Sequence, residues 1–83
     1  MTEEKTIQIA YYAILREERG CSEEAIESIA PTPRALYDEL KSEHGFSMNA
    51  EHLKVVVNDA FAPWDTSLQD GDNVVFIPPV AGG

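Results

Sequence analysis

The residues with the clearest chemical potential are the last six of the sequence, Pro78-Pro79-Val80-Ala81-Gly82-Gly83. Each proline fixes φ at about −65° and lacks a backbone N–H, so the start of this segment cannot pair back onto a sheet. The two glycines have no Cβ, which lets the backbone approach an enclosing surface closely. Six extended residues reach at most about 20 Å. We therefore expect a tail that carries the carboxylate of Gly83 into the active site of another protein.

Other residues that could do chemistry are isolated in the sequence. His44 and His52 have no third ligand at a spacing suited to zinc. Cys21 is the single cysteine, so it can form neither an internal disulfide nor a thiolate cluster, and no base lies near it in the sequence. No Ser-His-Asp set, phosphate-binding loop or pair of carboxylates is indicated by spacing. We expect no metal site, and we expect the chemistry to reside in the tail.

The composition indicates one small acidic domain. The chain has 83 residues, 43% of them hydrophobic, and 15 acidic against 6 basic side chains give a net charge of −9. Nucleic acid is not an expected partner, because phosphate neutralisation requires clustered Lys and Arg. The same charge favours docking on basic faces of enzymes. No secretory signal precedes the domain and no apolar run approaches the ~20 residues of a membrane span, so we expect a cytoplasmic protein that binds no membrane.

The local patterns predict alternating strands and helices. Thr32 is a good N-cap, Pro33 suits the first helical position, and Gly45 is a typical C-terminal stop. Gly20 similarly ends a preceding helical turn. Trp64 is expected to cover the core. The expected elements are strands over 6–13, 54–58, 60–62 and 73–77, a helical turn over 14–19, the main helix after Thr32, and turns at 58–59 and 70–72. Residues 22–26 locally favour a helix start.

Four motifs occur in a fixed order along most of the chain. They are Tyr11-Tyr12-Ala13-Ile14-Leu15-Arg16-Glu17 with Gly20, then Val57-Asn58, then Leu68-Gln69-Asp70-Gly71-Asp72, and finally the Pro-Pro-Val-Ala-Gly-Gly ending. Together they resemble the ubiquitin-like sulfur carriers, most closely the small subunit of molybdopterin synthase. The resemblance runs from about Ile7 to Gly83. A Gly-Gly ending is common, whereas the ordered set is specific.

The resemblance implies the architecture. It implies an α+β, ubiquitin-like β-grasp fold, with a mixed sheet of four to five strands packed on one main helix. Residues 1–77 would form the single domain and residues 78–83 the sulfur-carrying tail. Residues 22–29 would be an edge strand rather than a helix. The first and last strands would lie side by side and parallel at the centre of the sheet.

The resemblance also implies a function. An adenylating activating enzyme would use ATP to form an acyl adenylate at Gly83, and a sulfurtransferase would supply the sulfur that leaves a thiocarboxylate there. The large synthase subunit, in a heterotetramer, would use this sulfur on cyclic pyranopterin monophosphate. The chain would be a non-catalytic donor subunit that binds no cofactor itself. Its partner-binding residues would be Arg16, Phe61, Ile77, Pro78, Pro79, Val80, Ala81 and Gly82.

Two other functions fit the same tail. One is a sulfur carrier for thiamine or tRNA thiolation, which would share the thiocarboxylate but use a different acceptor. Thiamine carriers are usually shorter and lack the Pro-Pro-Val run, which favours molybdopterin. The other is a ubiquitin-like modifier that forms isopeptide bonds with lysines.

Overall fold

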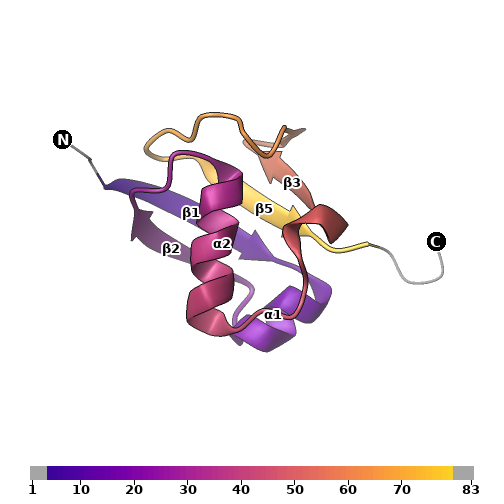
Figure 1. Cartoon of the computed structure of the whole chain (residues 1–83). Helices are drawn as coiled ribbons and strands as arrows, with labels where there is room; N and C mark the ends of the chain where they lie inside the picture. The colour runs from indigo at the N-terminus through magenta and orange to yellow at the C-terminus, as the bar shows by residue number, and fades with distance from the viewer. Residues whose placement is uncertain (1–3, 80–83) are drawn as a thin grey trace.

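The computed structural model describes residues 4–79, which form one five-stranded mixed sheet with helices packed against it (Figure 1). The elements are β1 (Lys5–Tyr11), α1 (Ala13–Arg19), β2 (Glu23–Ser28), α2 (Pro33–His44), the 3₁₀ helix η1 (Ala50–His52), β3 (Lys54–Val57), β4 (Ala60–Phe61) and β5 (Asn73–Ile77). No helix within these residues is long and apolar enough to cross a bilayer.

The strand order is β2-β1-β5-β3-β4. β1 and β5 pair in parallel, whereas β2, β3 and β4 pair with their neighbours in antiparallel fashion. The first and last strands therefore lie side by side at the centre, as the family resemblance implied. The predicted α+β architecture is confirmed, with five strands in the sheet.

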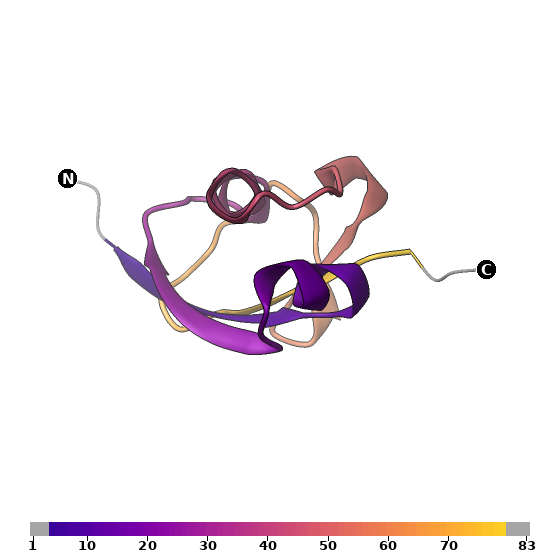
Figure 2. The same cartoon turned by 90° about the horizontal axis from the view of Figure 1, so that it is seen from below.

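Both helices lie on one side of the sheet (Figure 2). Thr32 caps α2, because its Oγ1 accepts a hydrogen bond from the backbone N–H of Ala35 at 3.2 Å. Gly45 ends the helix in the left-handed conformation with φ +69°. We call the helix-covered side the inner face and the opposite side the outer face. No helix of residues 4–79 covers the outer face.

An aromatic cluster fills the space between α2 and the inner face. Tyr37 of α2 lies against Phe76 of β5, with ring centroids 5.1 Å apart. Trp64 stacks on Phe76 at 5.9 Å and also contacts Tyr37 edge-on at 6.2 Å, which confirms its expected role as a cover for the core. Phe46 stacks on Tyr37 at 5.9 Å and contacts Tyr11 edge-on at 5.7 Å. These contacts join α2 to the two central strands.

The turn before β5 fastens the start of that strand to β1. The backbone N–H of Gly71 donates to the carbonyl of Thr6 at 2.8 Å, and the N–H of Thr6 donates to the carboxylate of Asp70 at 2.7 Å. The carbonyl of Asp72 accepts from the N–H of Gln8 at 3.0 Å. Gly71 has φ +87°, a conformation that glycine adopts without steric cost. The Gly-Asp motif thus sets the register of the parallel pair.

A second set of hydrogen bonds, made by Asn58, joins this turn to the β3–β4 hairpin. The Asn58 side chain donates to Asp72 at 2.9 Å and accepts from the N–H of Asn73 at 2.9 Å. Asn58 and Asp59 have φ of 51° and 70°, as a two-residue hairpin turn requires. Two motifs that lie far apart in the sequence therefore form one structural unit.

Most predicted boundaries hold to within one residue, and two larger differences from the local sequence signals have a structural cause. β1 ends at Tyr11, two residues earlier than predicted, because Ala13 takes φ +52° and starts α1 at once. The segment after Ser22 is the strand β2, although its residues locally favour a helix. All six residues of β2 pair with β1 in register, and this pairing outweighs the local helical preference.

Replacing Asp72 by alanine is expected to lower the free energy of unfolding by about 2–3 kcal/mol, because the N–H of Gln69 and the amide of Asn58 both lose a charged acceptor. Urea unfolding would measure the change. Asp65→Ala is the matched control, since Asp65 is exposed. If the two variants lose unfolding free energy to within about 0.5 kcal/mol of each other, the Asp72 hydrogen bonds do not stabilise the domain as proposed.

Candidate functional site

The candidate site begins where the central strand ends. β5 lies between β1 and β3, and Pro78 and Pro79 follow its last residue. β1 finishes at the same end of the sheet, because Tyr11 pairs with Phe76. The chain therefore leaves the body from the middle of the sheet. Pro78 is half-buried and Pro79 is exposed. The predicted site residues Val80, Ala81, Gly82 and Gly83 lie outside the described residues.

Phe61 and Ile77 lie on the outer face of the sheet. Side chains along β3 and β5 point alternately to the two faces of the sheet. The inward set is buried and consists of Val55, Val74 and Phe76. The outward set consists of Val56, Val75 and Ile77. Phe61 pairs directly with Val56, so it points the same way, and it is 72% exposed. Ile77 is half-buried.

Register alignment extends this apolar surface across four strands. Ala10 of β1 pairs with Val75, Val75 pairs with Val56, and Val56 pairs with Phe61. We call the set Ala10, Val56, Phe61, Val75 and Ile77 the outer patch. An exposed apolar stripe beside a chain exit is a typical protein-docking surface.

A hollow of about 340 Å³ opens at the edge of the sheet beside Phe61. It lies between β3, β4 and Trp64, and is lined by Leu53, Lys54, Val55, Phe61, Ala62 and Trp64. Five of these six residues are apolar, and Lys54 lies next to Ile77 in the strand register. The hollow could accept an apolar side chain from a partner that covers the outer patch.

Arg16 belongs to a different element from the outer patch. It is exposed on α1, which lies on the inner side of the sheet. Within residues 4–79 its guanidinium group makes no ion pair or hydrogen bond. The structure thus brings Phe61 and Ile77 onto one face and leaves Arg16 on a separate helix. Its predicted pairing with a partner carboxylate stays a prediction.

A family model described as the ThiS family matches residues 9–83, including the tail. The chain belongs to the ThiS family. Two relatives named molybdopterin synthase sulfur carrier subunit agree with this assignment. The protein from Escherichia coli (strain K12) is 30% identical over 80 residues, covering 93% of this chain and 99% of the relative. The protein from Mycobacterium tuberculosis (strain ATCC 25618 / H37Rv) is 32% identical over 82 residues, covering 93% and 96%.

Solved structures of similar proteins share the fold. A putative molybdopterin converting factor subunit 1 from Pyrococcus furiosus is 30% identical, with TM-score 0.76 and coverage of 92% of this chain and 99% of that one. SAMP1 from Haloferax volcanii has TM-score 0.77 at 23% identity, covering 94% and 99%. The complex of subunits 1 and 2 of the Helicobacter pylori molybdopterin-converting factor contains a chain with TM-score 0.66 at 22% identity, covering 94% and 99%. The predicted resemblance and the β-grasp fold are both confirmed.

The helix that carries Arg16 is held by polar contacts at two points. The N–H and hydroxyl of Ser47 donate to the carboxylate of Glu18 at 3.1 and 2.7 Å. At the end of α1, Arg19 forms two hydrogen bonds with Glu24 of β2, at 2.8 and 2.7 Å. Leu15 is fully buried beneath the helix. These contacts fix the orientation of α1 in this ThiS-family domain.

Glu24 is the centre of a polar cluster that the sequence did not reveal. The Tyr11 hydroxyl donates to its carboxylate at 2.6 Å, in addition to the two bonds from Arg19. The Arg19 bonds are the main cause that holds the pKa of Glu24 below its ordinary value, while partial burial opposes them. Burial, followed by the bond to Glu24, raises the pKa of Tyr11 far above its ordinary value. The cluster ties α1, β1 and β2 together.

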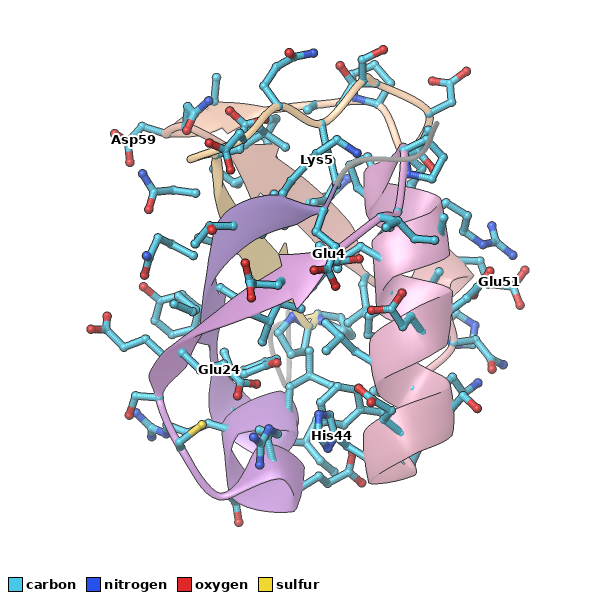
Figure 3. All side chains as sticks on the ribbon, turned by 90° about the vertical axis from the view of Figure 1, so that its left-hand side faces the viewer. Glu4, Lys5, Glu24, His44, Glu51 and Asp59 are labelled. Carbon is cyan, nitrogen blue, oxygen red and sulfur yellow. The ribbon has the colours of Figure 1, made fainter. Side chains whose placement is uncertain are left out.

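The isolated candidates from the sequence do not form a catalytic set. Figure 3 shows Glu24 and His44 toward the same end of the molecule. The His44 ring lies 5.8 Å from that of Phe46, and His52 is exposed in η1. Cys21 is half-buried and packs against the core. Among residues 4–79, no group of three or more His, Cys, Asp or Glu side chains is placed to hold a metal ion.

Glu24→Gln is expected to lower the free energy of unfolding at pH 7 by roughly 1–3 kcal/mol, because charged hydrogen bonds become neutral ones. The pKa of Glu24 is depressed in the folded state, so its stabilisation is present above the ordinary value of 4.5 and is lost as pH falls through the lower folded value. The difference in unfolding free energy between wild type and Glu24→Gln should therefore become smaller below pH 4.5.

Denaturant unfolding at several pH values between neutrality and the acid range would measure this difference. Glu27→Gln is the control, since Glu27 is exposed on the same strand. A difference for Glu24→Gln that stays constant into the acid range would show that the carboxylate charge does not stabilise the fold.

Proposed function

We propose that this chain is the sulfur carrier of a molybdopterin synthase and that Gly83 carries the sulfur as a thiocarboxylate. The observation that carries the proposal is the family match, which extends through the Gly-Gly tail to residue 83. The names of the two relatives, each aligned over 93% of this chain, support the same function. In this proposal residues 78–83 act as the tail of a domain formed by residues 1–77.

The proposed cycle begins with activation of the Gly83 carboxylate. An activating enzyme transfers AMP from ATP to the carboxylate, which releases pyrophosphate and replaces a poor leaving group by a good one. Hydrosulfide then attacks the carbonyl carbon and expels AMP, leaving the thiocarboxylate. With an enzyme-bound persulfide as the nucleophile, a thiol must then cleave the acyl disulfide. ATP binding and the catalytic groups belong to the partner enzymes.

The position at which the tail leaves the sheet suits delivery of sulfur to a partner enzyme. β5 is paired on both sides, so the base of the tail is anchored while Pro78 and Pro79 offer no N–H for pairing with another strand. The outer patch and the hollow beside Phe61 would then bind the large synthase subunit next to the exit. The Helicobacter pylori complex of subunits 1 and 2, which contains a similar chain, supports assembly with a large subunit.

Gly83 is expected to be the one covalently modified residue. Incubation with ATP, the cognate activating enzyme and a sulfur source should raise the intact mass by the difference between one sulfur and one oxygen atom. Fragment spectra should place this change on the last residue. Cys21→Ser is the matched control and should gain sulfur at the wild-type rate, because Cys21 packs against the core.

Three outcomes would contradict this assignment or redirect it. Sulfur located on Cys21 would contradict the thiocarboxylate. A loaded protein that supplies thiamine or tRNA thiolation and leaves cyclic pyranopterin monophosphate unchanged would indicate another carrier. Recovery of lysine conjugates from the native cell would indicate a protein modifier, and one similar solved structure is named Haloferax volcanii small archaeal modifier protein 1.

Ile77→Lys is expected to weaken binding to the large subunit about a hundredfold or more, because the new ammonium group would be buried against an apolar partner surface. The melting temperature should fall by only a few degrees, since Ile77 is half-buried on the outer face. Calorimetric titration and thermal unfolding on the same sample would test both statements.

Two further variants serve as controls for Ile77→Lys. Ile29→Lys should bind like wild type, because Ile29 is an exposed apolar residue outside the outer patch. Val74→Lys should unfold the domain, because Val74 is fully buried on the same strand. A folded Ile77→Lys protein with wild-type affinity would show that Ile77 is not part of the docking surface.

A further inference from the structure

A second hollow lies on the outer face, over the two central strands. Its volume is about 270 Å³. Ala10 and Val75 of the outer patch line its floor, and the polar side chains at its rim are Gln8, Glu23, Asp59 and Asn73. Figure 3 shows Asp59 on the side of the molecule away from α2, as this location requires.

The register explains why this surface is hollow. Ala10 pairs with Val75 on one side and with Glu23 on the other, so a short side chain lies between longer ones. Glu23 lies on the edge strand β2, and Asp59 lies in the β3–β4 turn near the opposite edge. Two carboxylates therefore flank an apolar floor from opposite sides.

The rim side chains are available to a ligand. Within residues 4–79, none of the four rim side chains takes part in a hydrogen bond or an ion pair. The carboxylates of Glu23 and Asp59 disfavour a phosphate or any other anion. They also disfavour a second copy of this acidic chain, because its own carboxylates would meet these two.

The chemistry of the hollow matches a basic side chain. The volume exceeds the roughly 30 Å³ that one water occupies, and falls below the roughly 300–1,000 Å³ of sites for small-molecule ligands. Lysine and arginine combine an aliphatic stem, which suits the floor of Ala10 and Val75, with a cationic head, which suits the two carboxylates.

We propose that this hollow receives a lysine or arginine side chain of the enzyme that docks on the outer patch. The inference rests on the proposed function, because that enzyme is the large synthase subunit. The apolar patch would supply most of the affinity. Glu23 and Asp59, which lie near opposite edges of the sheet on the same face, would fix the orientation of the enzyme relative to the tail exit.

Charge-neutralising variants test the proposal directly. Glu23→Gln, Asp59→Asn and the double variant keep the side-chain size, and asparagine tolerates the positive φ of position 59. In calorimetric titrations with the large subunit, the double variant should bind about tenfold more weakly at low salt. Its affinity should also fall less between about 50 and 300 mM NaCl, because part of the screened attraction is gone. Glu43→Gln, exposed on α2, is the control and should match wild type.

A filling variant tests the hollow independently of charge. Ala10→Leu would occupy the floor and should weaken binding to a similar extent at both salt concentrations, with the melting temperature as a check on folding. This inference would be overturned if the double variant and Ala10→Leu both bind with wild-type affinity while Ile77→Lys binds weakly. That result would leave the proposed function intact. A wild-type protein that neither gains sulfur nor binds the large subunit would instead overturn the proposed function and this inference with it.

Discussion

The parallel pairing of β1 with β5 is the constraint on which the rest of the structure depends. The Asp70-Gly71-Asp72 turn fixes its register through bonds to Thr6 and Gln8. This register places Phe76 against Tyr37 in the core and aligns Ala10 with Val75 outside. It also places the end of β5 at the centre of the sheet, so the same few hydrogen bonds determine where the tail leaves the domain.

The inner face of the sheet holds the fold together, and the outer face is the proposed recognition surface. The inner face is covered by the aromatic cluster and the helices, and on the central strands Ile7, Ile9, Tyr11, Val74 and Phe76 are almost completely buried. The outer face combines an apolar stripe with carboxylates on β2 and in the β3–β4 turn. Strand alternation lets one short sequence serve both purposes, since every second residue of β5 faces each side. Substitutions on the outer face can therefore change binding while the core stays intact.

Features set by local chemistry could be predicted from the sequence, and features set by register could not. The caps at Thr32 and Gly45 and the turn at Asn58 rest on single residues, and all three agree with the structure. β2 needed the family resemblance, because its pairing with β1 overrides a local helix signal. The Glu24 cluster joins residues of three different elements, so no sequence spacing could predict it. The tail motif could be recognised from residue types alone, and the family match extends over it, while its proposed chemistry stays a prediction.

The position of β5 has a mechanical consequence under the proposed function, in which other proteins act on the last residues of the chain. Pro78 and Pro79 directly follow β5, which carries a ladder of hydrogen bonds on each side, to β1 and to β3. Traction along the tail loads both ladders in shear, so their bonds must fail together rather than open one after another. An enzyme that grips the chain beyond Pro79 can therefore pull it taut while the domain stays folded.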